Sequence, residues 1–342
     1  MSVHGSDERD ARAARAADAP AKASSRREFV KAAAAVGVAA LLPSSARGET
    51  MARQAGSAEE HGWSRVPSIL ERIKPPRFAV KQFPITRFGA KGDGATDCTD
   101  AFRRAIAACV AQGGGHVVVR GGTFLTGPIH LGSHVNLVVE GDATISFATD
   151  PRAYEQYVLT RFEGTEMMGL SPLIYARNAV GVAVTGNGTL DGQAGNEHWW
   201  NWNGSARYGW KQGEGNQREA RARLFKMAED GVPVSARRFG VESFLRPQFI
   251  QPYHCRNVLI EGITIRNSPM WEINPVLCTN VTVRDVTIDS HGPNNDGCDP
   301  ESCRNVLIEG CTFDAVAKPD VLEHVTHLVE RNVTVNGQKV SR

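Results

Sequence analysis

Two carboxylates stand three residues apart in the stretch 291–299, HGPNNDGCD. Asp296 and Asp299 could form a catalytic pair, because splitting a glycosidic bond requires a proton donor for the leaving oxygen and a carboxylate that activates water. In an inverting mechanism the two carboxyl groups lie about 6.5–9.5 Å apart, which two residues along one strand or on neighbouring strands can meet. Asn294 and Asn295 could hold a sugar or orient a carboxylate. The same residue types also fill ordinary turns, so a purely structural turn stays open.

A tryptophan cluster is the second candidate feature. Trp199, Trp200 and Trp202 fall within residues 193–246, which interrupt the pattern of the surrounding chain and continue as a charged helical pattern at 218–229. We interpret this stretch as a long loop inserted between more regular elements, and long loops of this kind are usually functional or disordered. Clustered indoles suit sugar rings, whose C–H faces pack on aromatic planes, so these three residues are candidate substrate-binding residues. The alternative is that they pin the loop to the core.

The elements that would position these residues form a repeat. Three segments each hold two short β-rich runs around a polar or glycine turn: residues 257–265, 280–288 and 305–313. Their first asparagines, Asn257, Asn280 and Asn305, recur at intervals of 23 and 25 residues. A period of roughly 20–50 residues marks repeat architectures, and short β-rich runs without a helical pattern indicate a β-solenoid. We expect the asparagines to stack as a hydrogen-bonded ladder along one turn.

The repeat predicts an all-β fold in which residues 77–342 form a parallel β-helix, with the loop of about 193–246 inserted between two coils. Coils stacked about 4.8 Å apart would pair every strand with the coils above and below. Near the start, Phe102, Ile106 and Cys109 recur at helical spacing. We expect this short helix, around residues 99–112, to cap the N-terminal coil, which would otherwise present an open strand edge.

The first 46 residues are typical of an export signal. Arg26 and Arg27 precede an apolar run at 32–42, and small residues suitable for cleavage follow at 43–46. This order predicts a twin-arginine signal peptide, an interaction with the twin-arginine export machinery, and a periplasmic or secreted location. The apolar run is too short to span a bilayer, for which about 20 residues are needed. We interpret residues 47–76 as a polar linker.

Charge and cysteine content argue against several other classes. The 39 Lys and Arg nearly balance the 37 Asp and Glu, so no basic excess suggests nucleic acid, and no second apolar run suggests a membrane span.

The cysteines number seven. The twin-arginine route carries proteins folded in a reducing compartment, so we expect no disulfide framework. Cys298, Cys303 and Cys311 lack the matching His or Cys set of a zinc site. We expect neither a metal nor another cofactor.

Five segments together carry a resemblance to a known family: residues 88–94 (FGAKGDG), 123–127 (TFLTG), 171–175 (SPLIY), 186–192 (GNGTLDG) and 294–299 (NNDGCD). On these segments, residues 77–314 resemble glycoside hydrolase family 28, the polygalacturonases. The resemblance implies a right-handed parallel β-helix and inverting hydrolysis of α-linked galacturonan without a metal. It implies an acidic plant polysaccharide or oligogalacturonide as the partner, and a role for Asp296 in activating the attacking water.

The sequence also departs from this family's pattern. The family places a paired aspartate, whose first member is the general acid, about one coil after its first motif. Here Asp314 is followed by Ala-Val-Ala-Lys, and no Asp-Asp pair occurs anywhere in the chain. The family's Arg-Ile-Lys motif, which binds the substrate carboxylate, occurs only at residues 72–74, before the predicted solenoid.

These departures suggest an internal deletion or a gene-model error between Asp314 and Asp320. Other residues that could replace the missing acid are Asp299, Asp314, Asp320, Glu323 and His324. We therefore expect weak or no activity. The alternative to a hydrolase is a non-catalytic or vestigial β-helix that binds acidic polysaccharide. A polysaccharide lyase on a similar solenoid would need a calcium-binding carboxylate cluster, which one Asp-rich turn does not make.

Overall fold

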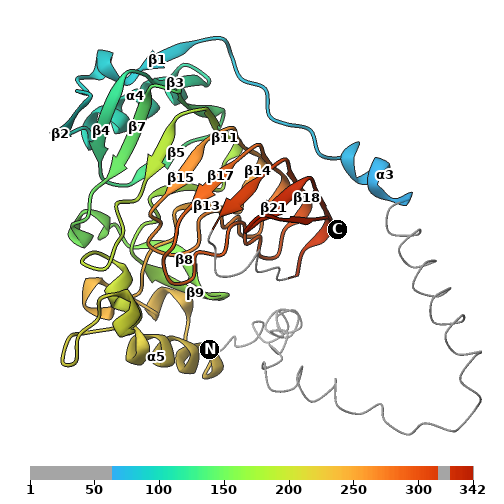
Figure 1. Ribbon diagram of the computed structural model, residues 1–342. Helices are drawn as coiled ribbons and strands as arrows, with labels where there is room; N and C mark the ends of the chain where they lie inside the picture. Colours follow the sequence, from blue (N-terminus) through green and yellow to red (C-terminus); the bar gives the residue numbers. More distant parts are fainter. Residues whose placement is uncertain (1–63, 315–323, 342) are drawn as a thin grey trace, which may run out of the picture. The chain divides into compact units, whose positions relative to one another are not determined.

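The computed structural model describes residues 64–314 and 324–341. These described residues belong to one compact unit. Its described part consists mostly of short β-strands stacked in successive coils (Figure 1). The predicted signal peptide, most of the predicted linker and the proposed deletion point after Asp314 lie outside the described residues.

Three sheets make up the stack, two long and one short. Their strands pair in parallel except for the last pair, β21 with β22, which is antiparallel. The first sheet contains, in order, β1 (Gln82–Pro84), β3 (Gly115–Val119), β6 (Val135–Val139), β11 (Val180–Gly186), β14 (Arg256–Glu261), β16 (Thr279–Arg284), β18 (Arg304–Glu309) and β20 (Thr326–Arg331). The second contains β2 (Asp93–Asp97), β4 (Gly122–Thr126), β7 (Ala143–Phe147), β12 (Thr189–Asp191), β15 (Thr264–Arg266), β17 (Thr287–Asp289), β19 (Thr312–Asp314), β21 (Val333–Val335) and β22 (Gln338–Val340). The third contains β5 (Ile129–Leu131), β10 (Ile174–Arg177) and β13 (Ile250–Tyr253).

Apolar residues repeat in register from coil to coil and form the core. In the first sheet Val182 pairs with Val258, Val258 with Val281, and Val281 with Val306. All four side chains are buried, and burying each contributes roughly 1.5–3 kcal/mol relative to exposure. One coil alone could not bury these residues, so the stack is held by neighbour contacts. The prediction of an all-β, right-handed parallel β-helix is confirmed.

The asparagine ladder is present at the start of β14, β16 and β18, where each asparagine is the second residue of its strand. The Asn280 side-chain amide donates to Asn257 Oδ1 at 2.9 Å, and the Asn305 amide donates to Asn280 Oδ1 at 2.8 Å. His327 Nδ1 continues the ladder, lying 2.9 Å from Asn305 Oδ1. All four residues have φ between 56° and 60°. Asparagine tolerates this left-handed conformation better than most side chains, which explains its recurrence.

Helix α4 (Thr99–Ala111) follows the predicted capping helix closely, and its residues Phe102, Ala105 and Ile106 are buried at the N-terminal end of the core. A shorter helix, α3 (Val66–Leu70), lies in the described part of the predicted linker. Ile69 and Ile73 cluster there with Leu307 and Val329 of the first sheet. No helix in the described residues is long and apolar enough to cross a membrane.

The predicted insertion lies between β12 and β13 and contributes no strand to the three sheets. It contains η3 (Trp200–Asn203), η4 (Ala206–Tyr208), α5 (Arg218–Glu229), η5 (Val234–Ala236) and η6 (Val241–Ser243). Helix α5, yellow in Figure 1, has the bounds of the charged helical pattern seen in the sequence. An antiparallel hairpin, β8 (Val158–Phe162) and β9 (Thr165–Gly169), leaves the stack one coil earlier. Two 3-10 turns, η1 (Ile85–Phe88) and η2 (Pro151–Tyr154), complete the described elements.

Candidate active site

The motif at 291–299 connects β17 to the continuation of the third sheet. Parallel bridges join Ile273 to Cys298, and Val276 to Glu301, extending that sheet by two coils beyond β13. Because parallel strands keep a constant register, Asp296 stacks on Trp271 of the preceding coil, and Asp299 stacks on Asn274. The two predicted carboxylates therefore lie on the same sheet, three residues apart along one strand edge.

The Asp296 carboxylate is held from the preceding coil. The Trp271 indole N–H donates to Asp296 Oδ2 at 2.8 Å, and Asp296 is 3% exposed. The neighbouring Glu272 is fully buried, and its Oε2 accepts from the Gly297 N–H at 3.0 Å. Burial raises the pKa of Glu272 well above its usual value, the charge of Asp296 raises it further, and the Gly297 N–H opposes the rise. The turn thus joins two carboxyl groups in different environments.

Asn294 and Asn295 shape the turn from within. Asn295 is fully buried. Its side-chain oxygen accepts from the Gly292 N–H at 2.6 Å, and its amide donates to the Met270 carbonyl at 2.8 Å. Asn294 has φ +62° and is half-buried, and its side-chain oxygen accepts from Arg246 Nη2 at 2.7 Å. Asn295 thus fixes the shape of the turn on which Asp296 lies.

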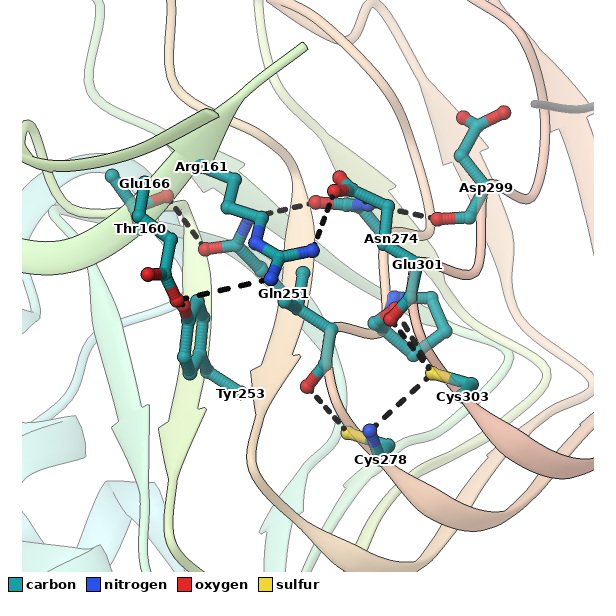
Figure 2. Close-up of polar contacts among 12 residues, drawn as sticks. Thr160, Arg161, Glu166, Gln251, Tyr253, Asn274, Cys278, Asp299, Glu301 and Cys303 are labelled. Atoms are coloured by element: carbon teal, nitrogen blue, oxygen red, sulfur yellow. Dashed lines mark hydrogen bonds and ion pairs between the residues drawn. The ribbon is translucent and has the colours of Figure 1, made fainter. Parts of the chain in front are cut away.

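Asp299 lies above a chain of buried polar side chains (Figure 2). The Asn274 amide donates to the Asp299 carbonyl at 2.8 Å and to Glu301 Oε1 at 3.0 Å. Asn274 in turn accepts from the Gln251 amide at 2.7 Å, and Gln251 accepts from the Thr160 hydroxyl at 2.6 Å. Asp299 itself is 0% exposed. This network ties three successive coils together beneath the motif.

Ion pairs hold the β8–β9 hairpin against the same face of the stack. Arg161 Nη1 lies 3.1 Å from Glu301 Oε2, and Arg161 Nη2 lies 3.8 Å from Glu166 Oε1. The Tyr253 hydroxyl donates to Glu166. The Glu301 side chain is fully buried and that of Arg161 is 13% exposed. Figure 2 shows Arg161 reaching from the hairpin toward Glu301, so the hairpin is fixed over this part of the stack.

Two of the three predicted tryptophans are part of the core. Trp199 is 2% exposed and Trp202 is 9% exposed. The Trp199 ring packs edge-to-face on Tyr154 and Trp202 at 5.5 and 5.0 Å between centroids, and Trp202 packs on Phe244 at 5.3 Å. Neither presents a free ring face, so both anchor the insertion, which is the alternative that the sequence left open.

Trp200 is the one that lies against the motif. It is half-buried, and its indole N–H donates to the Ser268 carbonyl at 2.8 Å. A side chain added at Gly292 would meet Trp200 Nε1 at 2.3 Å, so the ring sits directly on the motif's backbone. Glycine is required at 292 for this close approach.

Sequence reasoning missed several residues around the site. Glu272, Arg246 and Arg161 are isolated in the sequence, and no spacing pattern links them to the motif. The available signal is a charged residue inside an otherwise apolar run, as in Met-Trp-Glu-Ile around Glu272. Within residues 64–314 and 324–341, no group of three or more His, Cys, Asp or Glu is arranged to hold a metal ion. All seven cysteines are buried, and none forms a disulfide.

The family model described as glycosyl hydrolases family 28 matches residues 241–317. The chain is 30% identical over 262 residues to a probable polygalacturonase of Vitis vinifera, covering 73% of this chain and 46% of that protein. It is 27% identical to a polygalacturonase of Gossypium barbadense, covering 66% of this chain and 44% of the relative. The chain therefore spans about half the length of these curated relatives.

Among solved structures, the hyperthermoactive exopolygalacturonase of Thermotoga maritima superposes with a TM-score of 0.74 at 46% sequence identity. This likeness covers 79% of the present chain and 65% of the Thermotoga chain.

Proposed function

Since the chain belongs to glycoside hydrolase family 28, we propose that it is a pectin-degrading hydrolase that cleaves α-linked galacturonide bonds with inversion. The observation that carries this proposal is the setting of Asp296. Its carboxylate is held by the Trp271 indole, in a turn whose shape is fixed by Asn295. A carboxylate held in one place can take the proton of an attacking water. We assign this role to Asp296.

Asp299 is the second carboxyl group of the proposed pair. Three residues of extended chain span at most about 10 Å, and an inverting pair needs about 6.5–9.5 Å. The backbone spacing of the two residues is therefore compatible with an inverting pair. The bonds from Asn274 to the Asp299 carbonyl and to Glu301 fix the strand on which Asp299 lies.

The test is release of reducing ends from polygalacturonate by the purified chain, with a chelator present. Asp296→Asn and Asp299→Asn are compared with the unchanged chain, and Asp289→Asn, an exposed carboxylate nearby, is the matched control. We expect activity that is lost in Asp296→Asn, reduced in Asp299→Asn and kept in the control. Activity that survives in Asp296→Asn would contradict the assignment.

A second candidate function is supported by specific observations. The sequence has no Asp-Asp pair, and Asp296 and Asp299 are both almost fully buried. These features favour a β-helix that binds acidic polysaccharide without cleaving it. Calorimetric titration with oligogalacturonate separates the two proposals. Binding without any product, unchanged in Asp296→Asn, would support the binding protein over the hydrolase.

We also propose that the chain is exported by the twin-arginine route. The support is the order of Arg26-Arg27, an apolar run and small residues at the N-terminus. Replacing both arginines by lysine should retain the protein in the cytoplasm, as measured by cell fractionation. Export that continues unchanged would contradict this proposal.

A further inference from the structure

Arg246, at the end of the insertion, is almost fully enclosed beside the motif, with 1% exposure. Its Nε donates to Gln217 Oε1 at 3.2 Å. Its Nη1 donates to the carbonyl oxygens of Pro269 and Pro293 at 2.8 and 2.7 Å. Its Nη2 donates to Asn294 Oδ1 at 2.7 Å. One guanidinium thus joins the start of α5, the preceding coil and the motif turn.

The charge of Arg246 is unusual because these four acceptors are all uncharged oxygens. Taking a guanidinium out of water costs several kcal/mol, which neutral partners offset only in part. Burial lowers the pKa of Arg246 to about 10, and the charges of Glu163, Tyr208 and Asp296, in decreasing order, oppose this. With that pKa the group stays positive at neutral pH. Glu163 is paired with Arg221 at 2.5 Å, and Asp296 is the acidic residue in the turn that Arg246 holds through Pro293 and Asn294.

The contacts of Arg246 bear on the position of Asp296 as well as on its charge. Pro293 and Asn294, which Arg246 holds, precede Asp296 by three and two residues, and Asn294 has φ +62°. A turn with a left-handed residue persists only when its surroundings fix it. The planar fork of arginine reaches three acceptors on two coils at once. The single ammonium of lysine cannot reproduce this geometry.

We propose that Arg246 is a positioning residue for Asp296: it fixes the turn that presents this carboxylate and supplies the positive charge that keeps it ionised. The inference rests on the proposed function, in which Asp296 activates water. Glu272 on the preceding coil opposes the ionisation of Asp296, because its carboxyl group faces the same turn and two negative charges there repel each other. Arg246 thereby couples the insertion, through Gln217, to the catalytic motif.

The test uses Trp271 as a reporter that needs no substrate. Its indole N–H donates to Asp296 Oδ2, so its NMR signal should titrate with Asp296. Trp271→Phe assigns this signal among the six tryptophans. Asp296→Asn should abolish the titration of the Trp271 signal, whereas Glu272→Gln should leave that signal titrating. In Arg246→Met we expect the midpoint to rise by about one pH unit, since an opposite charge nearby favours the ionised form.

Arg246→Lys separates charge from geometry. Because it keeps the charge, its Trp271 midpoint should stay near that of the unchanged chain. Because it loses the fork, kcat on polygalacturonate should fall at least about tenfold with a smaller change in KM. A folded Arg246→Met protein with an unchanged midpoint would overturn the proposal. If Arg246→Met does not fold, Asn294→Asp places a carboxylate on the guanidinium, and an unchanged midpoint there would overturn it equally.

Failure of the proposed function and failure of this inference can be told apart. A chain that releases no reducing ends contradicts the hydrolase, whereas the Trp271 titration still decides whether Arg246 controls Asp296.

Discussion

Removing Arg161 should destabilise the chain far more than removing an exposed arginine. In Arg161→Met the Glu301 carboxylate, whose side chain is fully buried, loses its cation at 3.1 Å. Breaking a buried pair in this way costs about 3–5 kcal/mol, because an uncompensated charge stays behind. In a domain of this size 1 kcal/mol corresponds to roughly 2 °C in Tm. We therefore expect Tm to fall by about 6–10 °C.

Thermal unfolding followed by circular dichroism measures this effect. The control is Arg120→Met, which breaks a 2.8 Å pair with Glu140 that also joins neighbouring coils, but with side chains 49% and 40% exposed. An exposed pair contributes about 0–1 kcal/mol, so its Tm should move by no more than about 2 °C. The double variant Arg161→Met with Glu301→Gln should recover at least half of the loss, because the stranded charge is gone. Equal small losses for both single variants would refute the reasoning.

Three further predictions concern the core and the motif. Because the pKa of Glu272 is raised by burial, its ionisation costs stability as pH rises above the pKa of about 4.3 in the unfolded chain. Glu272→Gln should therefore raise Tm at pH 7 and flatten the fall of Tm with rising pH in calorimetric scans. An unchanged slope of Tm against pH would contradict this prediction. Asn280→Ala removes two ladder bonds at a left-handed residue and should cost about 2–3 kcal/mol in urea unfolding, while an unaltered midpoint would show that the ladder contributes nothing. The seven buried thiols should react with an aromatic disulfide reagent only after the chain unfolds. Rapid labelling of the native chain would contradict this and would show that the core opens.

The fold was predictable from the sequence where a single repeat length recurs along many residues. Asn257, Asn280 and Asn305 recur at the coil length, and their ladder follows from stacking. The helical pattern at 218–229 also became a helix with the same bounds. The packing of Ile69 on Leu307 could not be predicted, because it joins residues far apart in sequence and follows no repeat. The same holds for the clasp between Arg161 and Glu301.

The candidate site was predictable only as a local motif. The spacing of Asp296 and Asp299 within an Asn/Asp/Gly turn identified the segment, since turn chemistry is encoded by neighbouring residues. The tryptophans illustrate the limit of composition. An indole cluster suits both sugar stacking and core packing, and burial placed Trp199 and Trp202 in the core. Arg246 carries no local signal, because its partners come from three separate segments.

The measurement that tests the central claim most directly is the anomeric configuration of the first product. Proton NMR during hydrolysis of an α-linked oligogalacturonide shows which anomer of the new reducing end forms before mutarotation. An inverting pair that includes Asp296 predicts the β-anomer first, and no product from Asp296→Asn. An α-anomer formed first, or an unsaturated product that absorbs in the ultraviolet, would contradict the account.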